Sequence, residues 1–330
     1  MDSHAKSRLQ VISNQLNSGK DLKLQQCSGT DSKYRYTLDN PLLSQEQRQF
    51  YEDNGYLVVK NLVPSEPLQD YVDHFQKICQ GEASAPLLVV MRDVAIAKSE
   101  FVPGEKAVTK IQSFQNYEPL FDYCRTPEIL KYVECFCGAD IMAVHTMLIN
   151  KPPDPGTKTS RHPLHQDLNY FPFRPADRIV CAWTAMEKVT RANGCLVVLP
   201  GTHKEPLKKH TYPDWEGGVN KLYYGIQDYD PSLPKIHVEM EKGDTVFFHP
   251  LIIHGSGANK TTGFRKAISC HYASSKCHFI NSNETVSPET GHEILQLARK
   301  RVGDDVTITL PDVWKLQSRL VQGTNYNFTF

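Results

Sequence analysis

Two short stretches, far apart in the chain, carry the residues best suited to do chemistry. The first is His165-Gln166-Asp167 and the second is His254-Gly255-Ser256-Gly257. In an extended backbone, side chains two positions apart point to the same side, so His165 and Asp167 can present an imidazole and a carboxylate to one point. With His254 as the third ligand, this is the two-histidine, one-carboxylate set of non-haem Fe(II) oxygenases. That set leaves coordination positions open for O2 and a bidentate co-substrate.

A basic residue follows the second stretch closely. Arg265 stands eleven residues after His254, at the start of a strand-like run. A fixed guanidinium can bind a carboxylate through two parallel hydrogen bonds. Arg265 is therefore a candidate to hold the distal carboxylate of 2-oxoglutarate. A His-x-Asp pattern alone is a weak signal, and solvated surface loops are the alternative. The prediction rests on the combination of this pattern with a distant histidine followed by glycine and a basic residue shortly afterwards.

Other histidines compete for the metal. In regular strands, His162 and His249 have the wrong parity for the face that carries the ligands, so we interpret His162 as structural or supporting. His271 shares its parity with Arg265 and is the reserve ligand. No cysteine lies near the His/Asp pair, which argues against a structural zinc site.

Composition narrows the class of protein. The chain has 330 residues, enough for one large domain or two small ones. The 37 basic and 37 acidic residues balance, so nothing indicates nucleic acid or an anionic membrane as the main partner. No apolar run approaches the roughly 20 residues needed to span a bilayer. The nine cysteines are scattered without a CxxC pair, which favours reduced intracellular thiols over disulfides.

The polar segment 1–36 is interpreted as a targeting segment and flexible tether. Within it, the nonapeptide Arg8–Leu16 places leucines and an isoleucine at helical spacing after a basic residue. This resembles a nonapeptide peroxisomal targeting signal, a transit peptide read by an import receptor. An inert helix and a mitochondrial presequence are the alternatives, and Asp2 with the sparse arginines argues against the latter.

The remainder, 37–330, is expected to form one domain that begins with helices. Ser44 caps a predicted helix that Gly55 ends, a second helix runs from Pro64 to near Gly81, and a third spans 127–137. From Ile141 the pattern changes to short strands at 142–151, 178–186, 195–199, 236–240, 245–248 and 266–273. Turn signals such as Asn193-Gly194 join them, which favours an antiparallel sandwich or jelly roll. A helix is predicted at 289–301, and the last residues carry no clear signal.

Several runs together resemble the phytanoyl-CoA dioxygenase family, from about Asn40 into the C-terminal region. They are His165-Gln166-Asp167, Trp183-Thr184-Ala185, 193–203 and His254-Gly255-Ser256-Gly257, with Arg92-Asp93-Val94, 170–174 and 215–220 in support. The resemblance implies an Fe(II)/2-oxoglutarate oxygenase that is mainly β with flanking helices around a double-stranded β-helix (jelly-roll, cupin-like) core.

The resemblance also implies roles for individual residues. His165, Asp167 and His254 match the iron ligands, and Arg265 matches the residue that pairs with 2-oxoglutarate. Four others match the co-substrate pocket: Lys110, Met147, Trp183 and Ser256. From the residues alone, Lys110 would be a solvated lysine and Trp183 a core residue. Gln166 points away from its neighbours in an ideal strand, so a supporting or substrate-facing role stays open.

The implied reaction is 2-hydroxylation of phytanoyl-CoA and related branched acyl-CoAs, the first step of α-oxidation, in the peroxisome matrix. It would use Fe(II), 2-oxoglutarate, O2 and ascorbate (vitamin C), releasing succinate and CO2. Halogenating members replace the ligand carboxylate by a small residue, so the presence of Asp167 supports hydroxylation.

Three alternatives stay open. One is a related oxygenase that acts on another acyl-CoA or a small acid. Another is a non-catalytic jelly-roll binding module, and a cupin-like isomerase fits by fold alone but would not need Arg265. Lys204, Lys208 and Lys209 are candidates for the CoA phosphates, although such runs are usually solvated. Asn259 and Gly194 are interpreted as residues that shape loops.

Overall fold

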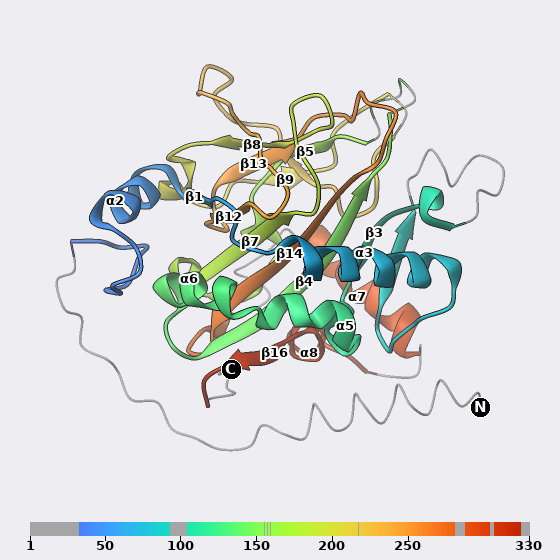
Figure 1. Ribbon diagram of the computed structural model, residues 1–330, viewed down its shortest axis with the longest axis horizontal. Helices are drawn as coiled ribbons and strands as arrows, with labels where there is room; N and C mark the ends of the chain where they lie inside the picture. The colour runs from blue at the N-terminus through green and yellow to red at the C-terminus, as the bar shows by residue number, and fades with distance from the viewer. Residues whose placement is uncertain are drawn as a thin grey trace.

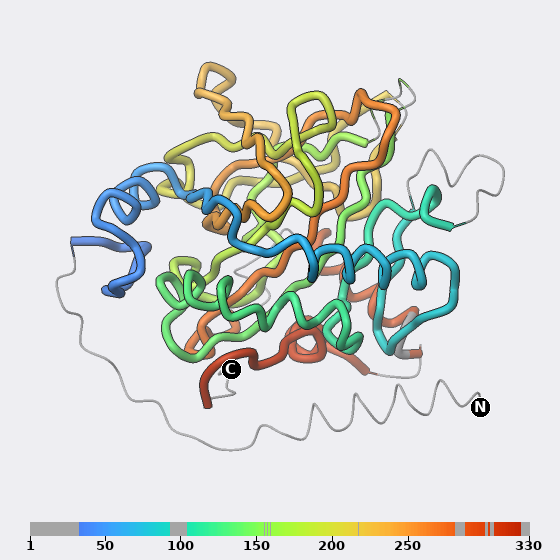
Figure 2. The backbone as a smooth tube through the Cα atoms, viewed as in Figure 1, coloured from blue at the N-terminus to red at the C-terminus, as the bar shows by residue number. Residues whose placement is uncertain are grey.

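The chain is described by a computed structural model over residues 33–92, 104–154, 156, 158, 160–216, 218–280, 288–303 and 307–324. The nonapeptide Arg8–Leu16, with its predicted helix, lies outside the described residues. Figures 1 and 2 show a layer of helices in front of long diagonal strands, with shorter strands above them. Within the described ranges, no helix is both long and apolar enough to cross a bilayer.

A large antiparallel sheet forms the centre of the molecule. In spatial order its strands are β1 (Tyr56–Val59), β12 (Thr245–Phe248), β7 (Ile179–Ala185), β14 (Arg265–Ser274), β4 (Ile141–Lys151), β3 (Val108–Gln112) and β2 (Val89–Arg92), and β16 (Arg319–Gln322) also pairs with β4. A smaller sheet has the order β11 (Ile236–Val238), β8 (Leu196–Leu199), β13 (Ile253–Ser256) and β5 (His162–His165). Two short pairs complete the strands: β10 (Gly225–Ile226) with β9 (His210–Thr211), and β15 (His278–Phe279) with β6 (Phe173–Arg174). The predicted mainly β architecture with a jelly-roll core is confirmed.

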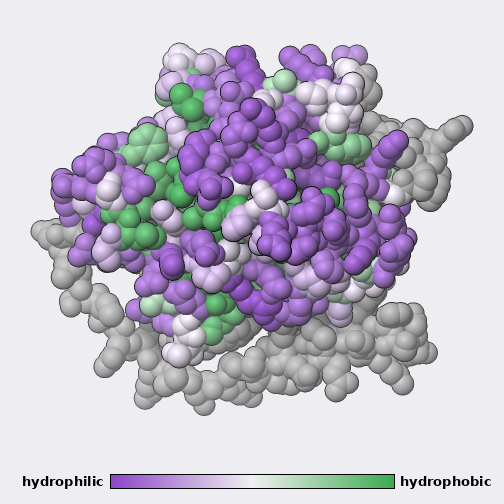
Figure 3. Space-filling model, in the orientation of Figure 1, coloured by the Kyte–Doolittle hydropathy of each residue, from purple (hydrophilic) through white to green (hydrophobic). Residues whose placement is uncertain are grey.

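Alternation along β7 shows how the large sheet separates two cores. Cys181, Trp183 and Ala185 belong to an apolar cluster shared with the smaller sheet. Val180 and Ala182 belong to a different cluster, under the helices. Successive strand residues point to opposite faces, and both faces of this strand are buried, which explains its continuous apolar sequence. The face shown in Figure 3 is mostly hydrophilic, as expected when the apolar residues are used in these cores.

Helices cover the outer face of the large sheet. They are α3 (Ser65–Gln80), α5 (Glu118–Phe121) and α6 (Pro127–Cys137), with α2 (Gln45–Asn54) at one end of the layer. Single turns of 3-10 helix connect elements at η1 (Gly104–Ala107), η2 (Phe114–Asn116), η3 (Asp122–Arg125), η4 (Asp167–Tyr170), η5 (Ala176–Arg178) and η6 (Thr202–Lys204). The predicted ends of α2 are confirmed, because Ser44 forms a capping box and Gly55 adopts a left-handed conformation with φ of 78°.

The C-terminal helices pack together beside the sheets. The prediction at 289–301 is confirmed as α7 (Pro288–Val302), whereas α8 (Leu310–Gln317) and β16 were not predicted. A signal for α8 was present, because Thr309 and Asp312 form a reciprocal capping box. In the described part of the chain, the eight cysteines are free, as expected of reduced thiols.

Glu52 of α2 holds the first described residues against the body. Its carboxylate accepts hydrogen bonds from the backbone N–H groups of Arg35 at 3.0 Å, Tyr36 at 2.9 Å and Thr37 at 2.7 Å. The Thr37 hydroxyl donates a further bond at 2.8 Å, and Tyr36 is only 5% exposed. Charge-assisted bonds of this kind are the stronger ones in proteins, so this arrangement ties the segment down firmly. We call these bonds the Glu52 anchor.

Candidate active site

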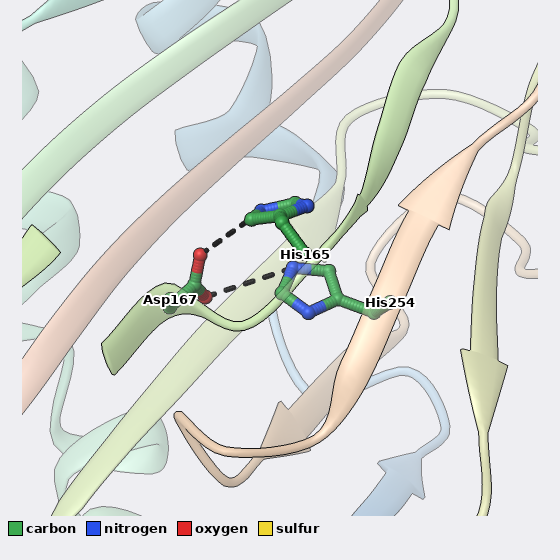
Figure 4. A group of neighbouring side chains, drawn as sticks. All are labelled: His165, Asp167 and His254. Atoms are coloured by element: carbon green, nitrogen blue, oxygen red, sulfur yellow. Dashed lines mark ion pairs between the residues drawn. The ribbon is translucent and has the colours of Figure 1, made fainter. Parts of the chain in front are cut away.

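Two strands and one short helix bring the three predicted ligands together. His165 ends β5, Asp167 begins η4, and His254 lies in β13 directly opposite His165. One ligand atom from each residue lies within 4.8 Å of the other two, and the residues are 5–7% exposed. Figure 4 shows Asp167 facing both imidazoles, with His165 Nε2 at 3.2 Å and His254 Nε2 at 3.6 Å from its carboxylate oxygens.

Backbone carbonyl groups orient the two imidazoles. Nδ1 of His165 lies 2.9 Å from the Pro163 carbonyl oxygen, and Nδ1 of His254 lies 3.1 Å from that of Ile252. Each Nδ1–H therefore donates to the backbone, and each Nε2 keeps a lone pair for a ligand bond. Burial lowers the pKa of His254 to about 4, so its imidazole is neutral at physiological pH. Burial alone would raise the pKa of Asp167, but the neighbouring imidazoles hold it well below its usual value. Two imidazole nitrogens with free lone pairs and an ionised carboxylate fit Fe(II).

His271 lies behind the carboxylate. Its Nε2 is 2.8 Å from Oδ2 of Asp167, and the residue is 2% exposed. Strand parity correctly placed it on the same side of β14 as Arg265, where both line the same cavity. Its Nε2 is engaged with the carboxylate, so the geometry favours an orienting group over the reserve ligand that parity allowed.

The predicted orientation of His162 is wrong. Its ring centroid lies 4.3 Å from that of His165, and both residues line the same two cavities. The pairing of β13 with β5 shifts register between His254 and Ser256, so regular alternation does not hold over this short strand. His249 does lie away from the triad, as predicted, and its Nε2 is 3.5 Å from Asp177.

Arg265 is a buried cation at the first position of β14. It is 2% exposed, and its Nη2 donates a hydrogen bond of 2.9 Å to the Gly194 carbonyl oxygen. Among the described residues, Nε and Nη1 have no hydrogen-bond partner. Burial lowers its pKa to about 10, so the group stays charged at neutral pH. Buried unpaired donors are costly, and a bound carboxylate would satisfy both.

Two cavities share His165 and Asp167 in their walls. The smaller, of about 90 Å³, is lined by the triad, Arg265 and the four other residues predicted for the co-substrate pocket: Lys110, Met147, Trp183 and Ser256. The larger, of about 470 Å³, is lined by His165 and Asp167 and extends to β2, α7 and α8. All the residues predicted for the co-substrate pocket therefore face one chamber.

Lys110 and Trp183 are both buried in the wall of this chamber. Lys110 is 6% exposed, and its Nζ lies 4.4 Å from the ring centroid of Tyr223. The interpretation of Lys110 as a solvated lysine is therefore wrong. The Arg265 guanidinium carbon lies 5.3 Å from the centroid of the Trp183 ring, so that indole is a wall beside the cation as well as a core residue.

Gln166 has a structural role rather than a substrate-facing one. It is fully buried, its Nε2 donates to the Leu251 carbonyl oxygen at 2.9 Å, and its Oε1 accepts from the Lys208 backbone N–H at 2.8 Å. Asn259 shapes its loop as predicted, because its Nδ2 donates to the Gly263 carbonyl oxygen at 2.8 Å. Gly194 has φ of 80°, and a Cβ there would lie 2.6 Å from a backbone oxygen, so only glycine fits.

The lysine run suggested for the CoA phosphates does not line either cavity. Nζ of Lys204 lies 3.5 Å from Asp53, and Nζ of Lys208 lies 2.9 Å from Glu205. Instead, Lys221 belongs to the lining of the larger cavity. The interpretation of the run as an ordinary charged surface is the one that this geometry favours.

Residues that sequence reasoning missed come from a loop and from the C-terminal helices. Tyr223 lines both cavities, and its ring centroid lies 4.1 Å from that of His162. No local pattern singled it out, because its position depends on contacts far along the chain. Apolar side chains of α7 and α8 also line the larger cavity. The spacing of Ile294, Leu297 and Ala298 marks one face of a helix and could have indicated a lining surface.

The chain is similar in sequence to known proteins over most of its length. A family model described as Phytanoyl-CoA dioxygenase (PhyH) matches residues 51–267. The chain is 61% identical over 295 residues to "Phytanoyl-CoA dioxygenase, peroxisomal" of Rattus norvegicus, covering 89% of this chain and 87% of that protein. It is 57% identical over 332 residues to the protein of the same name from Homo sapiens, covering 98% of each.

A solved structure shares the fold. The crystal structure of EctD from S. alaskensis with bound Fe superposes with a TM-score of 0.57. The match covers 76% of this chain and 84% of that chain, at 14% sequence identity. At such low identity, the likeness shows a common arrangement of sheets and helices.

Proposed function

Because this chain belongs to the phytanoyl-CoA dioxygenase family, we propose that it is a peroxisomal phytanoyl-CoA 2-hydroxylase that uses Fe(II) and 2-oxoglutarate. The observation that carries the proposal is one chamber that holds the His165, Asp167 and His254 cluster together with Arg265. The reaction would hydroxylate carbon 2 of phytanoyl-CoA and related branched acyl-CoAs, with release of succinate and CO2. Ascorbate would keep the metal reduced.

His165, Asp167 and His254 would hold the metal. Bound Fe(II), with 2-oxoglutarate and O2, supplies the oxidising chemistry that couples decarboxylation of the co-substrate to insertion of oxygen. Arg265 would bind the distal carboxylate of 2-oxoglutarate through its two unpaired N–H groups, with the Ser256 hydroxyl beside it. Lys110 would add positive charge to the same chamber. These contacts fix the co-substrate so that its position does not depend on the acyl-CoA.

The chain also controls where the acyl-CoA meets the reacting centre. His165 and Asp167 form part of the wall of the larger cavity, so carbon 2 of an acyl thioester can lie beside the triad while the rest of the molecule extends away. Tyr223 and Met147 line both cavities and would separate the co-substrate from the substrate. Burial of the triad excludes bulk water, which limits turnover of the co-substrate without hydroxylation.

An aerobic assay tests the proposed reaction. Fe(II), 2-oxoglutarate, ascorbate and phytanoyl-CoA are supplied, and mass spectrometry follows the acyl product and succinate together. The expected product is one oxygen heavier than the substrate and forms in step with succinate. Succinate without a hydroxylated product would indicate an oxygenase for a different acyl-CoA or a small acid. Absence of both, with no Fe(II)-dependent binding of 2-oxoglutarate, would leave a jelly-roll binding module.

His271 is expected to set the affinity for iron. His271→Phe keeps a ring but removes the donor to Asp167, so the Fe(II) concentration for half-maximal activity should rise about 10- to 100-fold. His271→Gln, which retains an N–H donor, should recover part of this loss. Iron titrations of activity would measure the effect, with the thermal midpoint as a check on folding. An unchanged iron requirement in a folded His271→Phe protein would contradict the orienting role.

We propose that the chain acts in the peroxisome matrix, and that an import receptor reads Arg8–Leu16. The support is the nonapeptide pattern, together with relatives that are peroxisomal by name. A fluorescent protein that carries residues 1–36 at its N-terminus should enter peroxisomes, and the same fusion with Arg8→Ala should stay outside. Mitochondrial import of the fusion, or equal import of both fusions, would refute the signal.

A further inference from the structure

The larger cavity has one wall of a different chemical character from the rest. This wall is built by β2, α7 and α8, which also contribute Arg92 and Gln317, and its apolar side chains include Val89, Met91, Ile294, Leu297, Val313 and Trp314. We call this set the apolar wall. We propose that the apolar wall holds the acyl chain of the substrate and sets which chain lengths the protein accepts. The proposal rests on the proposed function for the identity of the substrate.

The sequence of α7 explains how the helix presents an apolar face to the cavity. Ile294, Leu297 and Ala298 recur at spacings of three and four residues, which places them along one side of a helix. Gln296, which lies between these residues, and Arg299, which follows them, are exposed to solvent. The helix is therefore amphipathic, and its apolar side forms cavity surface as well as packing against α8.

Contacts at the first turn of α7 tie the apolar wall to the metal-binding segment. Thr290 Oγ1 lies 3.4 Å from Nδ2 of Asn169, which belongs to η4, the short helix that Asp167 begins. One turn later, the hydroxyl groups of Tyr212 and Tyr224 both donate to Glu293 Oε2 at 2.7 Å. The later positions then follow at about 5.4 Å per turn. Residues further along α7 therefore lie progressively further from the triad.

The distribution of charge favours a hydrocarbon at the apolar wall. Among the charged lining side chains, Lys110, Asp167 and Lys221 come from other elements and Arg92 ends β2, whereas the lining residues of α7 in the described ranges are all apolar and α8 adds Gln317. A polar ligand would lose its water against the α7 side chains without gaining partners there. Each methylene group moved from water to such a surface strengthens binding about three- to fourfold. A long chain therefore gains affinity that a short chain lacks.

Leu297→Trp tests the proposal, with Gln296→Trp as the matched control on the exposed side of the same helix. Dissociation constants for hexanoyl-CoA, dodecanoyl-CoA and phytanoyl-CoA are measured without O2, with Fe(II) and 2-oxoglutarate bound. The bulk of the indole in Leu297→Trp should weaken the binding of phytanoyl-CoA at least about tenfold relative to that of hexanoyl-CoA. Gln296→Trp should keep the wild-type ratio of the two dissociation constants. Leu297→Ala, which removes contacts without adding bulk, should also lower the preference for the long chain. The visible absorption of bound 2-oxoglutarate reports that each variant is folded.

The outcomes separate the apolar wall from the reaction. Equal losses for the three thioesters, or an unchanged ratio in Leu297→Trp, would overturn the apolar wall even if the wild-type protein hydroxylates phytanoyl-CoA. A selective loss of long-chain binding in a protein that hydroxylates none of the thioesters would support the apolar wall and refute the proposed function.

Discussion

Replacing His254 by alanine is expected to lower Fe(II)-dependent turnover of phytanoyl-CoA by at least about 1,000-fold, even at high iron. The side chain is 5% exposed, and its Nε2 faces the Asp167 carboxylate at 3.6 Å. Its removal leaves an imidazole and a carboxylate, which cannot hold the metal in a defined geometry. The hydroxylated product and succinate would be quantified together, and iron binding would be measured separately.

The matched control for this prediction is His237→Ala. His237 lies in β11 of the same small sheet but is exposed and outside both cavities, so its removal should leave turnover within about twofold, as is usual for surface substitutions. If His254→Ala kept more than a tenth of the activity with an unchanged iron requirement, the proposed ligand set would be wrong. His162 or His271 would then be the histidine to replace next.

Replacing Arg265 by alanine is expected to raise the KM for 2-oxoglutarate on the order of 100-fold or more, since two hydrogen bonds to a charged group are lost. The guanidinium is buried, and its Nε and Nη1 lack partners among the described residues. Arg265→Lys keeps the charge but not the planar fork, so its KM should lie between those of the wild type and Arg265→Ala. Initial rates at varied 2-oxoglutarate, with acyl-CoA saturating, would measure both variants.

A second co-substrate distinguishes a lost carboxylate contact from general damage. Pyruvate has the keto-acid end of 2-oxoglutarate but no distal carboxylate, so Arg265 should contribute little to its use. The preference for 2-oxoglutarate over pyruvate should therefore fall by the same factor as the KM effect. A variant whose use of both oxo acids drops equally, or whose KM changes for the acyl-CoA alone, would contradict the assigned contact.

Strand parity predicted the site where the strands are long and regular. Along β14, the rule placed His271 on the same side as Arg265, and both residues line the chamber. The same rule was wrong for His162, because β5 is short and its pairing shifts register beside Ser256. A register shift depends on the partner strand, and the partner of β5 is β13, which lies far from it in the sequence. Local spacing therefore could not reveal it.

The burial of polar residues could not be predicted from local sequence either. Lys110 looks like a surface residue by type, yet the ring of Tyr223 and the neighbouring strands enclose it. The helix ends were predictable because caps act within a few residues, as Ser44 and Gly55 show in α2. Lys110, Met147, Trp183 and Ser256 were predicted for the co-substrate pocket from the family resemblance rather than from any periodicity.

The Glu52 anchor limits how far a protease could shorten the chain from its N-terminal side. A protease needs several residues of extended, accessible chain around the bond that it cuts. The backbone of Arg35, Tyr36 and Thr37 is engaged with the Glu52 carboxylate, so it cannot enter a protease cleft without first breaking those bonds. Any trimming of the segment that precedes the anchor would then end upstream of Arg35. The anchor would thereby define the first residues of a mature chain without any recognition sequence at that point.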